Sequence, residues 1–169
     1  MIKLKRIMEN VDWRDPFGSW ESVPQDSRIA VGYRGESGEK SGDSEGRGLY
    51  IARDIETAQF FGNVRKIAFI VPKNSFIVDE EPLYILHDDD ELKNPISPND
   101  SEWLKVCKMT FQKAIEKYGD EWNSHWNEVS KTQGEILTQI LKSKGYDSVY
   151  VSSGEEEWVV LFNPKIAKI

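Results

Sequence analysis

Cysteine and histidine are scarce in this sequence of 169 residues, which contains one cysteine, Cys107, and two histidines, His87 and His125. A single cysteine cannot form a disulfide within the chain, and no Cys-x-x-Cys pair or Cys/His cluster suggests a zinc site. The two histidines lie far apart and share no metal-ligand spacing, so we expect both to be ordinary surface or edge residues. The sequence therefore predicts no metal site.

Long apolar runs are also absent. No stretch approaches about 18 consecutive apolar residues, so no membrane-spanning helix is predicted. The basic start, Met1 to Arg6, is not followed by an apolar run, which argues against a secretory signal. The phosphate-binding Gly-x-x-x-x-Gly-Lys-Ser/Thr, the Gly-x-Ser-x-Gly elbow and His-Glu-x-x-His are missing as well. We expect a soluble cytoplasmic protein, in the host cytoplasm if a phage encodes it, outside these enzyme classes.

Basic residues are too few for a typical nucleic-acid-binding protein, because 22 Lys and Arg face 29 Asp and Glu, a net charge of -7. The acidic residues are concentrated between Asp79 and Glu102, where nine acidic residues stand against one basic residue, Lys93. A segment of this kind is either a solvated, self-repelling loop or an acidic surface for a partner. Both interpretations stay open at this stage.

Aromatic residues are abundant, with 6 Trp, 7 Phe and 6 Tyr, and this number argues against intrinsic disorder. The length fits one domain over residues 1–169. Within it we expect an N-terminal arm over 1–27, which packs its aromatic residues on the body, and an acidic and helical insert over 80–131.

Short strands are predicted at 28–34, 48–52, 64–71, 75–79, 147–151 and 157–162. Helices are predicted over 55–61, from a Ser97 cap to Gly119, and from a Thr132 capping box to Gly145. Because strands and helices do not alternate regularly, a doubly wound parallel sheet is disfavoured and the α+β class is predicted.

Three short motifs carry side chains that could perform chemistry. The first, Gly32 to Gly35, ends a strand with Arg34, whose planar guanidinium can bind a phosphate or a carboxylate. In the second, Gly46 to Ala52, glycines flank Tyr50, whose ring offers a stacking face for a cationic ring. The third is the acidic run Glu155–Glu157 before an apolar strand, where neighbouring carboxylates raise each other's proton affinity. Each motif alone also fits a structural role.

Taken together, these motifs resemble the ADP-ribosyltransferase superfamily. The shared pattern is a strand ending in Tyr-Arg-Gly, then Gly-x-Gly-Leu-Tyr-x-Ala, a helix with Thr-Ala-x-Phe-Phe-Gly, and a late Gly-Tyr-Asp before a Glu-led final strand. The stretch Gly46 to Gly62 looks like the segment of the poly-ADP-ribose polymerase branch and the diphtheria-like toxins. The resemblance covers roughly residues 28–79 and 132–166, and it implies split antiparallel β-sheets with NAD in the cleft between them.

The resemblance also implies roles for individual residues. Arg34 falls at the position that orients the ribose or phosphate of NAD, Tyr50 at the aromatic that stacks on nicotinamide, and Glu157 at the final-strand glutamate. Glu155 falls where some members keep a second acid, and the register of the catalytic acid within Glu155, Glu156 and Glu157 stays open. The implied NAD-contacting residues are Tyr33, Arg34, Gly35, Gly48, Leu49, Tyr50, Ala58 and Phe61, whereas Phe60 and Phe61 are also expected to pack the helix on the core.

Two functions follow from this sequence. The first is a small mono-ADP-ribosyltransferase of a phage- or toxin-like type, which uses NAD as a substrate and modifies a macromolecular acceptor that we expect to be a protein. No membrane partner is expected, and the charge disfavours nucleic acid. The second is a catalytically inactive binding or inhibitor protein on the same fold, acting through the acidic segment Asp79–Glu102.

Overall fold

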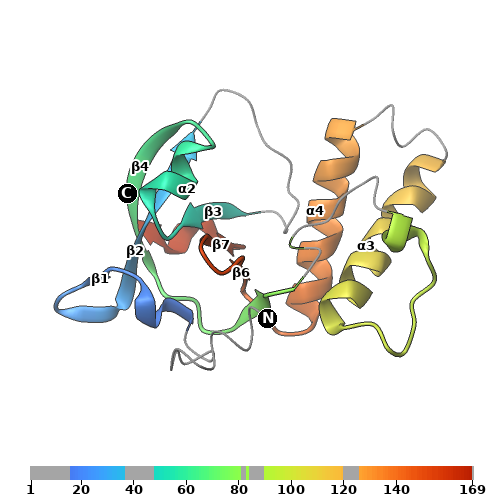
Figure 1. Ribbon diagram of the computed structural model, residues 1–169, viewed down its shortest axis with the longest axis horizontal. Helices are drawn as coiled ribbons and strands as arrows, with labels where there is room; N and C mark the ends of the chain where they lie inside the picture. The colour runs from blue at the N-terminus through green and yellow to red at the C-terminus, as the bar shows by residue number, and fades with distance from the viewer. Residues whose placement is uncertain (1–15, 37–47, 81–82, 84–89, 120–125, 169) are drawn as a thin grey trace. The chain divides into compact units, whose positions relative to one another are not determined.

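The computed structural model describes residues 16–36, 48–80, 83, 90–119 and 126–168 (Figure 1). The described chain divides into two compact units. One unit holds 16–36, 48–80 and 147–168, and the other holds the described residues between 83 and 146. The first part of the predicted arm, both histidines and residues 81–82 and 84–89 of the acidic segment lie outside the described residues.

The first unit contains an eight-stranded sheet that confirms the α+β class. Its order is β5-β6-β7-β3-β2-β4-β8, with β1 beside β2, and the β5–β6 pair is parallel whereas the other pairs are antiparallel. The strands are β1 Ser22–Val23, β2 Asp26–Glu36, β3 Leu49–Ala52, β4 Asn63–Ile70, β5 Ser75–Val78, β6 Ser148–Ser152, β7 Glu157–Leu161 and β8 Ala167–Lys168. All six predicted strands are present, and the two-residue strands β1 and β8 are additional.

The sheet has two halves that join at one point. The ladder between β2 and β3 holds a single residue pair, Tyr33 opposite Ala52. Beyond that pair, β2 continues along β4 as far as Glu36, and β3 pairs along its whole length with β7. The described strands therefore form one continuous sheet with a weak junction, where the sequence predicted split sheets.

An aromatic core covers one face of this sheet. The 3-10 helix η1, Pro16–Ser19, places Phe17 and Trp20 against the ring of Tyr150, with ring centroids 5.1 Å and 6.0 Å away. This confirms the prediction that the arm packs its aromatic side chains on the body, for these two residues. The core cluster consists of Phe17, Trp20, Ala30, Ile51, Ile67, Phe69, Tyr150, Val159 and Leu161.

The short helix α2, Ile55–Gln59, follows β3 and contacts β2, β3 and β4. Asp54 caps it by accepting a hydrogen bond from the Thr57 amide at 2.8 Å, as predicted. Its buried side is made by the small residues Thr57 and Ala58, so the helix lies close to β2.

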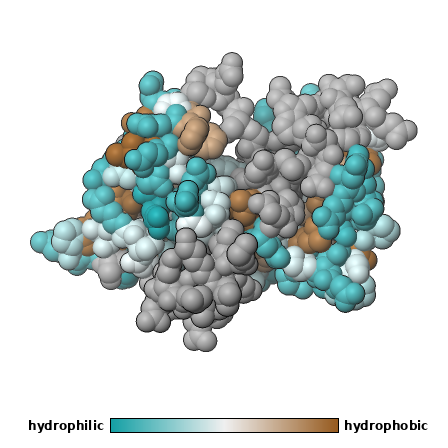
Figure 2. Space-filling model, viewed as in Figure 1, coloured by the Kyte–Doolittle hydropathy of each residue, from teal (hydrophilic) through white to brown (hydrophobic). Residues whose placement is uncertain are grey.

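The expected core packing of Phe60 and Phe61 is wrong, because they are 79% and 54% exposed. Helix α2 ends at Gln59 and buries only Thr57 and Ala58, so Phe60 and Phe61 follow the helix and are not on its buried side. Ile55 is also 44% exposed, and Figure 2 shows apolar side chains reaching the surface among hydrophilic ones in the region of α2.

The second unit contains the 3-10 helix η2, Asp90–Lys93, and the helices α3, Glu102–Tyr118, and α4, Trp126–Ser143. Helix α3 is capped by Ser101 and not by the predicted Ser97. The Ser97 amide donates instead to Asp100 at 2.8 Å, which closes a separate turn before the helix. The carboxylate of Asp100 also accepts a hydrogen bond from the buried Lys108 at 2.8 Å, and this tie explains why the turn stays outside the helix.

Helix α4 begins before the predicted capping box at Thr132. The Thr132 hydroxyl lies 3.0 Å from that of Tyr118 on α3, so it links the two helices and does not cap α4. Leu137, Ile140 and Leu141 are buried, as the apolar stripe predicted. None of the helices within the described ranges is long and apolar enough to cross a membrane.

Candidate functional site

Glu157, the first residue of β7, is the buried member of the acidic run. Its side chain is 9% exposed, and three side chains donate hydrogen bonds to its carboxylate. Oε2 accepts from Arg53 Nη1 at 2.9 Å and from the Tyr150 hydroxyl at 2.7 Å, and Oε1 accepts from the Ser152 hydroxyl at 3.1 Å. The network fixes the carboxylate in one orientation and compensates its charge, as burial of an ionised group requires.

Tyr150 carries this network into the aromatic core. Its hydroxyl accepts a hydrogen bond from the indole nitrogen of Trp20 at 2.8 Å, and the Pro16 carbonyl lies 3.2 Å away. The ring of Tyr150 is fully buried. A phenol has one proton to donate. The Glu157 carboxylate is closer than the Pro16 carbonyl and is the stronger acceptor, so it receives this proton. A rigid packed ring therefore sets the position of the carboxylate.

Arg53 supplies the positive charge next to Glu157. Its main-chain amide donates to the Glu157 carbonyl at 2.9 Å, because β3 and β7 are antiparallel neighbours. Its Nη1 also reaches the Ser19 hydroxyl at 3.4 Å, and its side chain is 33% exposed. The guanidinium is therefore anchored on one side by Glu157 and exposed to solvent on another.

Arg34 shares a sheet face with Glu157. Tyr33, Ala52 and Trp158 are opposite one another across β2, β3 and β7, so these three side chains share one face. Arg34 follows Tyr33, and Glu157 precedes Trp158, so alternation places both on the other face. There, Arg34 lies opposite Arg65, and each has a nitrogen 3.4 Å from Oε1 of Glu36.

Tyr33 and Tyr50 lie on the face opposite Glu157. Tyr50 is half-buried and lies opposite Val160, in the same alternation as Ala52 and Trp158. The Tyr33 hydroxyl lies 3.5 Å from Glu21, which also binds Lys66 Nζ at 3.1 Å. The hydrogen bond and the charge of Glu21 raise the pKa of Lys66. The structure therefore brings Arg34 and Glu157 to one face and the two tyrosines to the other.

Gly35 and Gly48, two of the predicted NAD-contacting residues, lie where other parts of the chain pack closely against the backbone. A Cβ at Gly35 would collide with the Ala58 carbonyl oxygen and with Phe61, so this glycine lets α2 pack on β2. A Cβ at Gly48 would collide with the Leu161 carbonyl oxygen. The structure thus places Gly35 against Ala58 and Phe61, and it is the chain of α2 and the turn after it that approaches this glycine. Leu49, which is also among the predicted NAD-contacting residues, packs against the core cluster.

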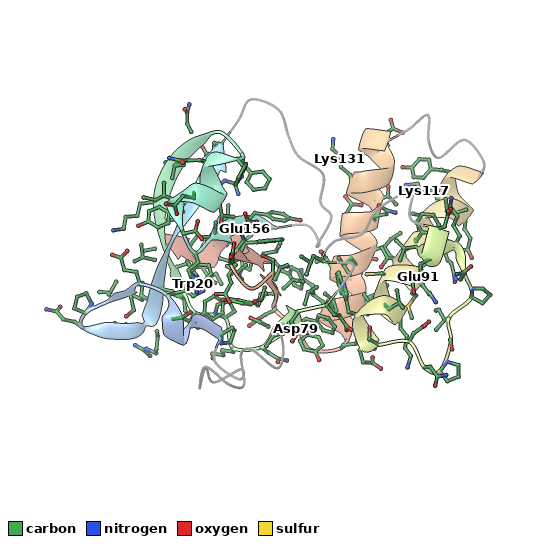
Figure 3. The ribbon with its side chains drawn as sticks, in the orientation of Figure 1. Trp20, Asp79, Glu91, Lys117, Lys131 and Glu156 are labelled. Carbon is green, nitrogen blue, oxygen red and sulfur yellow. The ribbon has the colours of Figure 1, made fainter. Side chains whose placement is uncertain are left out.

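Glu155 and Glu156 belong to an exposed turn before β7 (Figure 3). Ser153 forms this turn, because its amide donates to the Glu156 carbonyl at 3.0 Å and its hydroxyl accepts from the Glu156 amide at 3.1 Å. Gly154 adopts a φ of 97°, which suits glycine. The turn distinguishes the three acids by burial, and only Glu157 enters the network.

Sequence reasoning missed Arg53, Tyr150, Ser152 and Trp20. Tyr150 and Ser152 are adjacent to Glu157 only through the β6–β7 register, and Trp20 reaches Tyr150 from a distant segment. Alternation along 148–152 predicts that Tyr150 and Ser152 share a face, but no pattern indicates which strand lies beside them. Within the described residues, no group of three His, Cys, Asp or Glu side chains could hold a metal ion.

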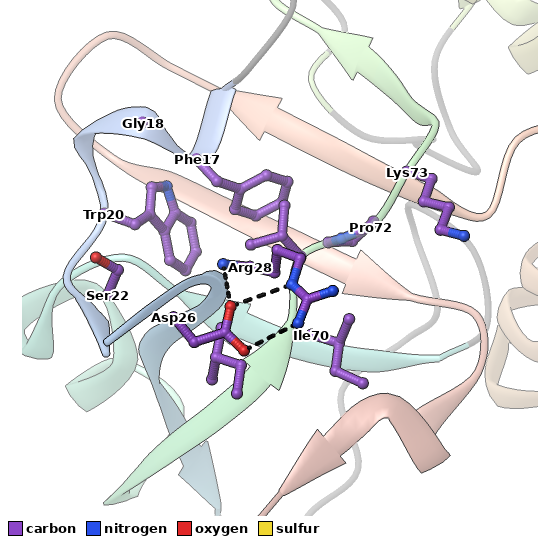
Figure 4. Close-up of a pocket in the computed structure, with 11 residues that line it drawn as sticks. Phe17, Gly18, Trp20, Ser22, Asp26, Arg28, Ile70, Pro72 and Lys73 are labelled. Carbon is purple, nitrogen blue, oxygen red and sulfur yellow. Dashed lines mark hydrogen bonds and ion pairs between the residues drawn. The ribbon is translucent and has the colours of Figure 1, made fainter. Parts of the chain in front are cut away.

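A hollow of about 680 Å³, which Trp20 also lines, lies at the other end of β2 (Figure 4). Phe17, Trp20, Arg28, Ile70 and Lys73 are among its lining residues, and none of the predicted site residues is. Asp26 accepts hydrogen bonds from Nε and Nη2 of Arg28 at 3.2 Å and 3.4 Å, and these bonds together with its charge raise the pKa of Arg28.

Comparison with known proteins gives no family. No family model matches the chain, and no curated protein matches it. The chain is similar to one solved structure, described as the crystal structure of an anti-CRISPR protein, with 19% identity over 86% of this chain and 98% of that one. The TM-score of 0.35 is too low for this likeness to carry an argument about fold or function.

Proposed function

We propose that this protein is a mono-ADP-ribosyltransferase that cleaves NAD and transfers ADP-ribose to a macromolecular acceptor, in the first place a protein. The observation that carries the proposal is the fixed carboxylate of Glu157 at the start of β7, held by Arg53, Tyr150 and Ser152. In this proposal Glu157 is the catalytic acid, at the position that the sequence resemblance assigns.

The reaction explains why a fixed carboxylate matters. The bond between the nicotinamide nitrogen and ribose C1′ breaks, its electron pair goes to nicotinamide, and positive charge develops on the sugar, as in glycoside cleavage. The acceptor nucleophile then bonds to C1′ and releases its proton. A carboxylate that is already oriented stabilises the developing charge without reorganising during the reaction.

Arg34 and Tyr50 serve the same substrate in this proposal. Arg34 lies on the face of Glu157, where its guanidinium suits the ribose hydroxyls or a phosphate. Tyr50 lies on the other face, and the nicotinamide would reach it where β2 and β3 separate beyond Tyr33 and Ala52. An aromatic face there stabilises the cationic nicotinamide ring of NAD.

Burial favours Glu157 over the two preceding acids. Glu155 and Glu156 are exposed on the turn, so solvent competes for their carboxylates and their rotamers are not fixed by neighbours. Glu157 is 7% exposed as a residue and has named partners. Glu155 keeps the role of a second acid at the entrance, two residues earlier.

The test compares two variants of adjacent acids. Purified wild type, Glu157→Gln and the matched control Glu156→Gln are incubated with labelled NAD and a cell lysate, and nicotinamide release and protein labelling are measured. Glu157→Gln should lower both by about 10²-fold or more, and Glu156→Gln should stay within about twofold. Thermal melting of each variant separates loss of the acid from loss of the fold.

Two results would overturn the proposal. One is a folded Glu157→Gln variant with the wild-type rate. The other is a wild-type protein that neither releases nicotinamide in lysate nor binds NAD in calorimetry, which would leave the binding-protein alternative and its acidic segment Asp79–Glu102 as the object of study.

A further inference from the structure

The guanidinium of Arg53 is held at one end and open at the other. Nη1 donates to Oε2 of Glu157 at 2.9 Å, and the side chain of this acid is 9% exposed. Because Tyr150 and Ser152 fix the same carboxylate, the contact also fixes one end of the guanidinium. Nε and Nη2 form the edge that faces away from Nη1, and neither atom has a hydrogen-bond partner among the described residues. This edge can donate two parallel hydrogen bonds to one anion.

Three other arginines lie within the described ranges, and none has an open edge that is held in place. Nε and Nη2 of Arg28 both donate to Asp26, so that edge is occupied (Figure 4). Nε of Arg34 lies 3.4 Å from Glu36. Arg65 also contacts Glu36 through Nη1 at 3.4 Å, but the two side chains are 48% and 43% exposed, so no buried acid fixes them. Arg65 is therefore the matched control.

The hydroxyl of Ser19 adds a third donor beside Arg53. Its oxygen accepts from Nη1 of Arg53 at 3.4 Å, so its own proton is available for an acceptor. Ser19 is exposed and the Arg53 side chain is 33% exposed, so a ligand can reach both from solvent. Two N–H groups, one O–H group and a positive charge match the several oxygens of a phosphate group.

We propose that Arg53 and Ser19 bind the phosphate group that is attached to the nicotinamide ribose of the substrate. This inference rests on the proposed transferase function, because that function supplies the nucleotide. Glu157 then has two roles, since it stabilises positive charge on the ribose and also holds the arginine that binds the neighbouring phosphate. Arg34, whose Nε faces Glu36, is left to bind the ribose hydroxyls.

The contact between Arg53 and Glu157 suits this division of roles. In NAD, the phosphate is joined to C5′ of the same ribose whose bond from C1′ to nicotinamide breaks. A phosphate bound at Arg53 therefore keeps this ribose close to the carboxylate of Glu157, which lies 2.9 Å from the guanidinium. Orienting the substrate in this way lowers the entropy that the reaction must lose. The guanidinium is already held by a buried acid, so less of its freedom is lost on binding.

The test uses two probes that differ by a single phosphate, nicotinamide mononucleotide and nicotinamide riboside. Each probe is titrated by calorimetry into the whole chain as wild type, Arg53→Lys and Arg65→Lys. Lysine keeps the positive charge beside Glu157, but its ammonium cannot form the two parallel bonds of the guanidinium edge. The wild type should bind the mononucleotide at least about tenfold more tightly than the riboside, because charge-assisted hydrogen bonds are the stronger ones.

Arg53→Lys should weaken binding of the mononucleotide about tenfold and change binding of the riboside by less than about twofold. A misfolded variant would lose both probes, so the ratio of the two affinities separates the phosphate site from the fold. Ser19→Ala, a change at an exposed residue, should weaken binding of the mononucleotide about threefold. It decides the question if Arg53→Lys is not folded. Arg65→Lys should bind both probes within about twofold of the wild type.

The inference is overturned if the wild type binds both probes equally or binds neither. It is also overturned if a folded Arg53→Lys loses affinity equally for both probes, or if Arg65→Lys loses as much affinity for the mononucleotide. Nicotinamide release from NAD separates this result from the proposed function. Binding of the mononucleotide through Arg53 without release in lysate would retain the phosphate site and overturn the transferase. Release with an unchanged KM in Arg53→Lys would retain the transferase and overturn the phosphate site.

Discussion

The hydroxyl of Tyr150 lies 2.7 Å from Oε2 of Glu157 and 2.8 Å from the indole nitrogen of Trp20. It therefore joins the buried carboxylate to the indole. One side chain thus connects the acid at the start of β7 with a ring that belongs to the core and also lines the hollow. Hydrogen bonds to a charged group inside a protein are stronger than those between neutral groups. The position of Glu157 therefore depends on packing around Trp20 as well as on its own strand.

Tyr150→Phe should lower the free energy of unfolding by about 1–3 kcal/mol, because both Glu157 and the Trp20 indole lose a buried partner. Urea denaturation measures this change. Tyr33→Phe is the control, because the Tyr33 hydroxyl has a long, exposed contact of 3.5 Å, and its effect should stay within about 0.5 kcal/mol. Equal effects of the two variants would contradict a structural role for the network.

The pair of Arg53 and Glu157 should be strongly coupled. Arg53→Met leaves the buried carboxylate without its cation and should cost about 1–3 kcal/mol, less than a fully buried pair because Arg53 is 33% exposed. Glu157→Gln in the same chain removes the uncompensated charge and should restore part of the loss. A double-mutant cycle by urea denaturation measures the coupling, and additive single effects would show that the two side chains act independently.

The strands were predictable because their signals are local. Residues Ile29 to Tyr33 of β2 form a short run without charged residues, and Asp54 marks the start of α2 in the sequence itself. The site was less predictable, because it depends on register between strands that are far apart in sequence. Glu157 meets Tyr150, Ser152 and Arg53 through the pairing of β7 with β6 and β3, and no residue pattern states that pairing.

Two of the three predicted helix starts, at Ser97 and Thr132, were wrong for a related reason. Ser97 and Thr132 have the side chains of N-caps, but each takes part in another contact. Ser97 belongs to a turn that Asp100 closes, and Thr132 binds Tyr118 across the helix pair. A capping propensity of about 1 kcal/mol is easily outweighed by such contacts. The sequence identifies residues that are able to cap a helix, but the contacts of each residue in the folded chain determine whether it does so.

Gly35 should tolerate no side chain. A Cβ there would meet the carbonyl of Ala58 in α2 and the Cβ of Phe61 just after it, so Gly35→Ala must push the helix away from β2. Overpacking of this kind costs about 1–3 kcal/mol. Hydrogen exchange should show faster exchange of the α2 amides in the variant, whereas the amides of α3 in the other unit keep their protection. Unchanged exchange in α2 would show that the close approach is not needed.

Phe60 and Phe69 provide a contrast between an exposed ring and a core ring. Phe60 is 79% exposed, so Phe60→Ser should change the free energy of unfolding by no more than about 0.5 kcal/mol. Phe69 is fully buried beside Phe17 and Trp20, so Phe69→Ala should cost about 3–5 kcal/mol. Thermal and urea unfolding measure both changes. A large loss in Phe60→Ser would mean that this ring is covered in solution.

The pair of Asp100 and Lys108 should make stability depend on acidic pH. The hydrogen bond from Lys108, followed by that from the Ser97 amide, lowers the pKa of Asp100 from its ordinary value of 3.8. A carboxyl group with a lowered folded-state pKa contributes stability that is fully present above pH 3.8 and is lost as the pH falls through the folded-state value.

Asp100→Asn removes this contribution, so the difference in urea midpoint between wild type and variant should be largest near neutral pH. It should shrink as the pH falls below 3.8, because protonated Asp100 resembles the amide. Glu102→Gln is the control, because the side chain of Glu102 is 69% exposed and its contact with Lys105 is 3.6 Å long. A difference between wild type and Asp100→Asn that does not vary with pH would show that the pair acts through shape and not through charge.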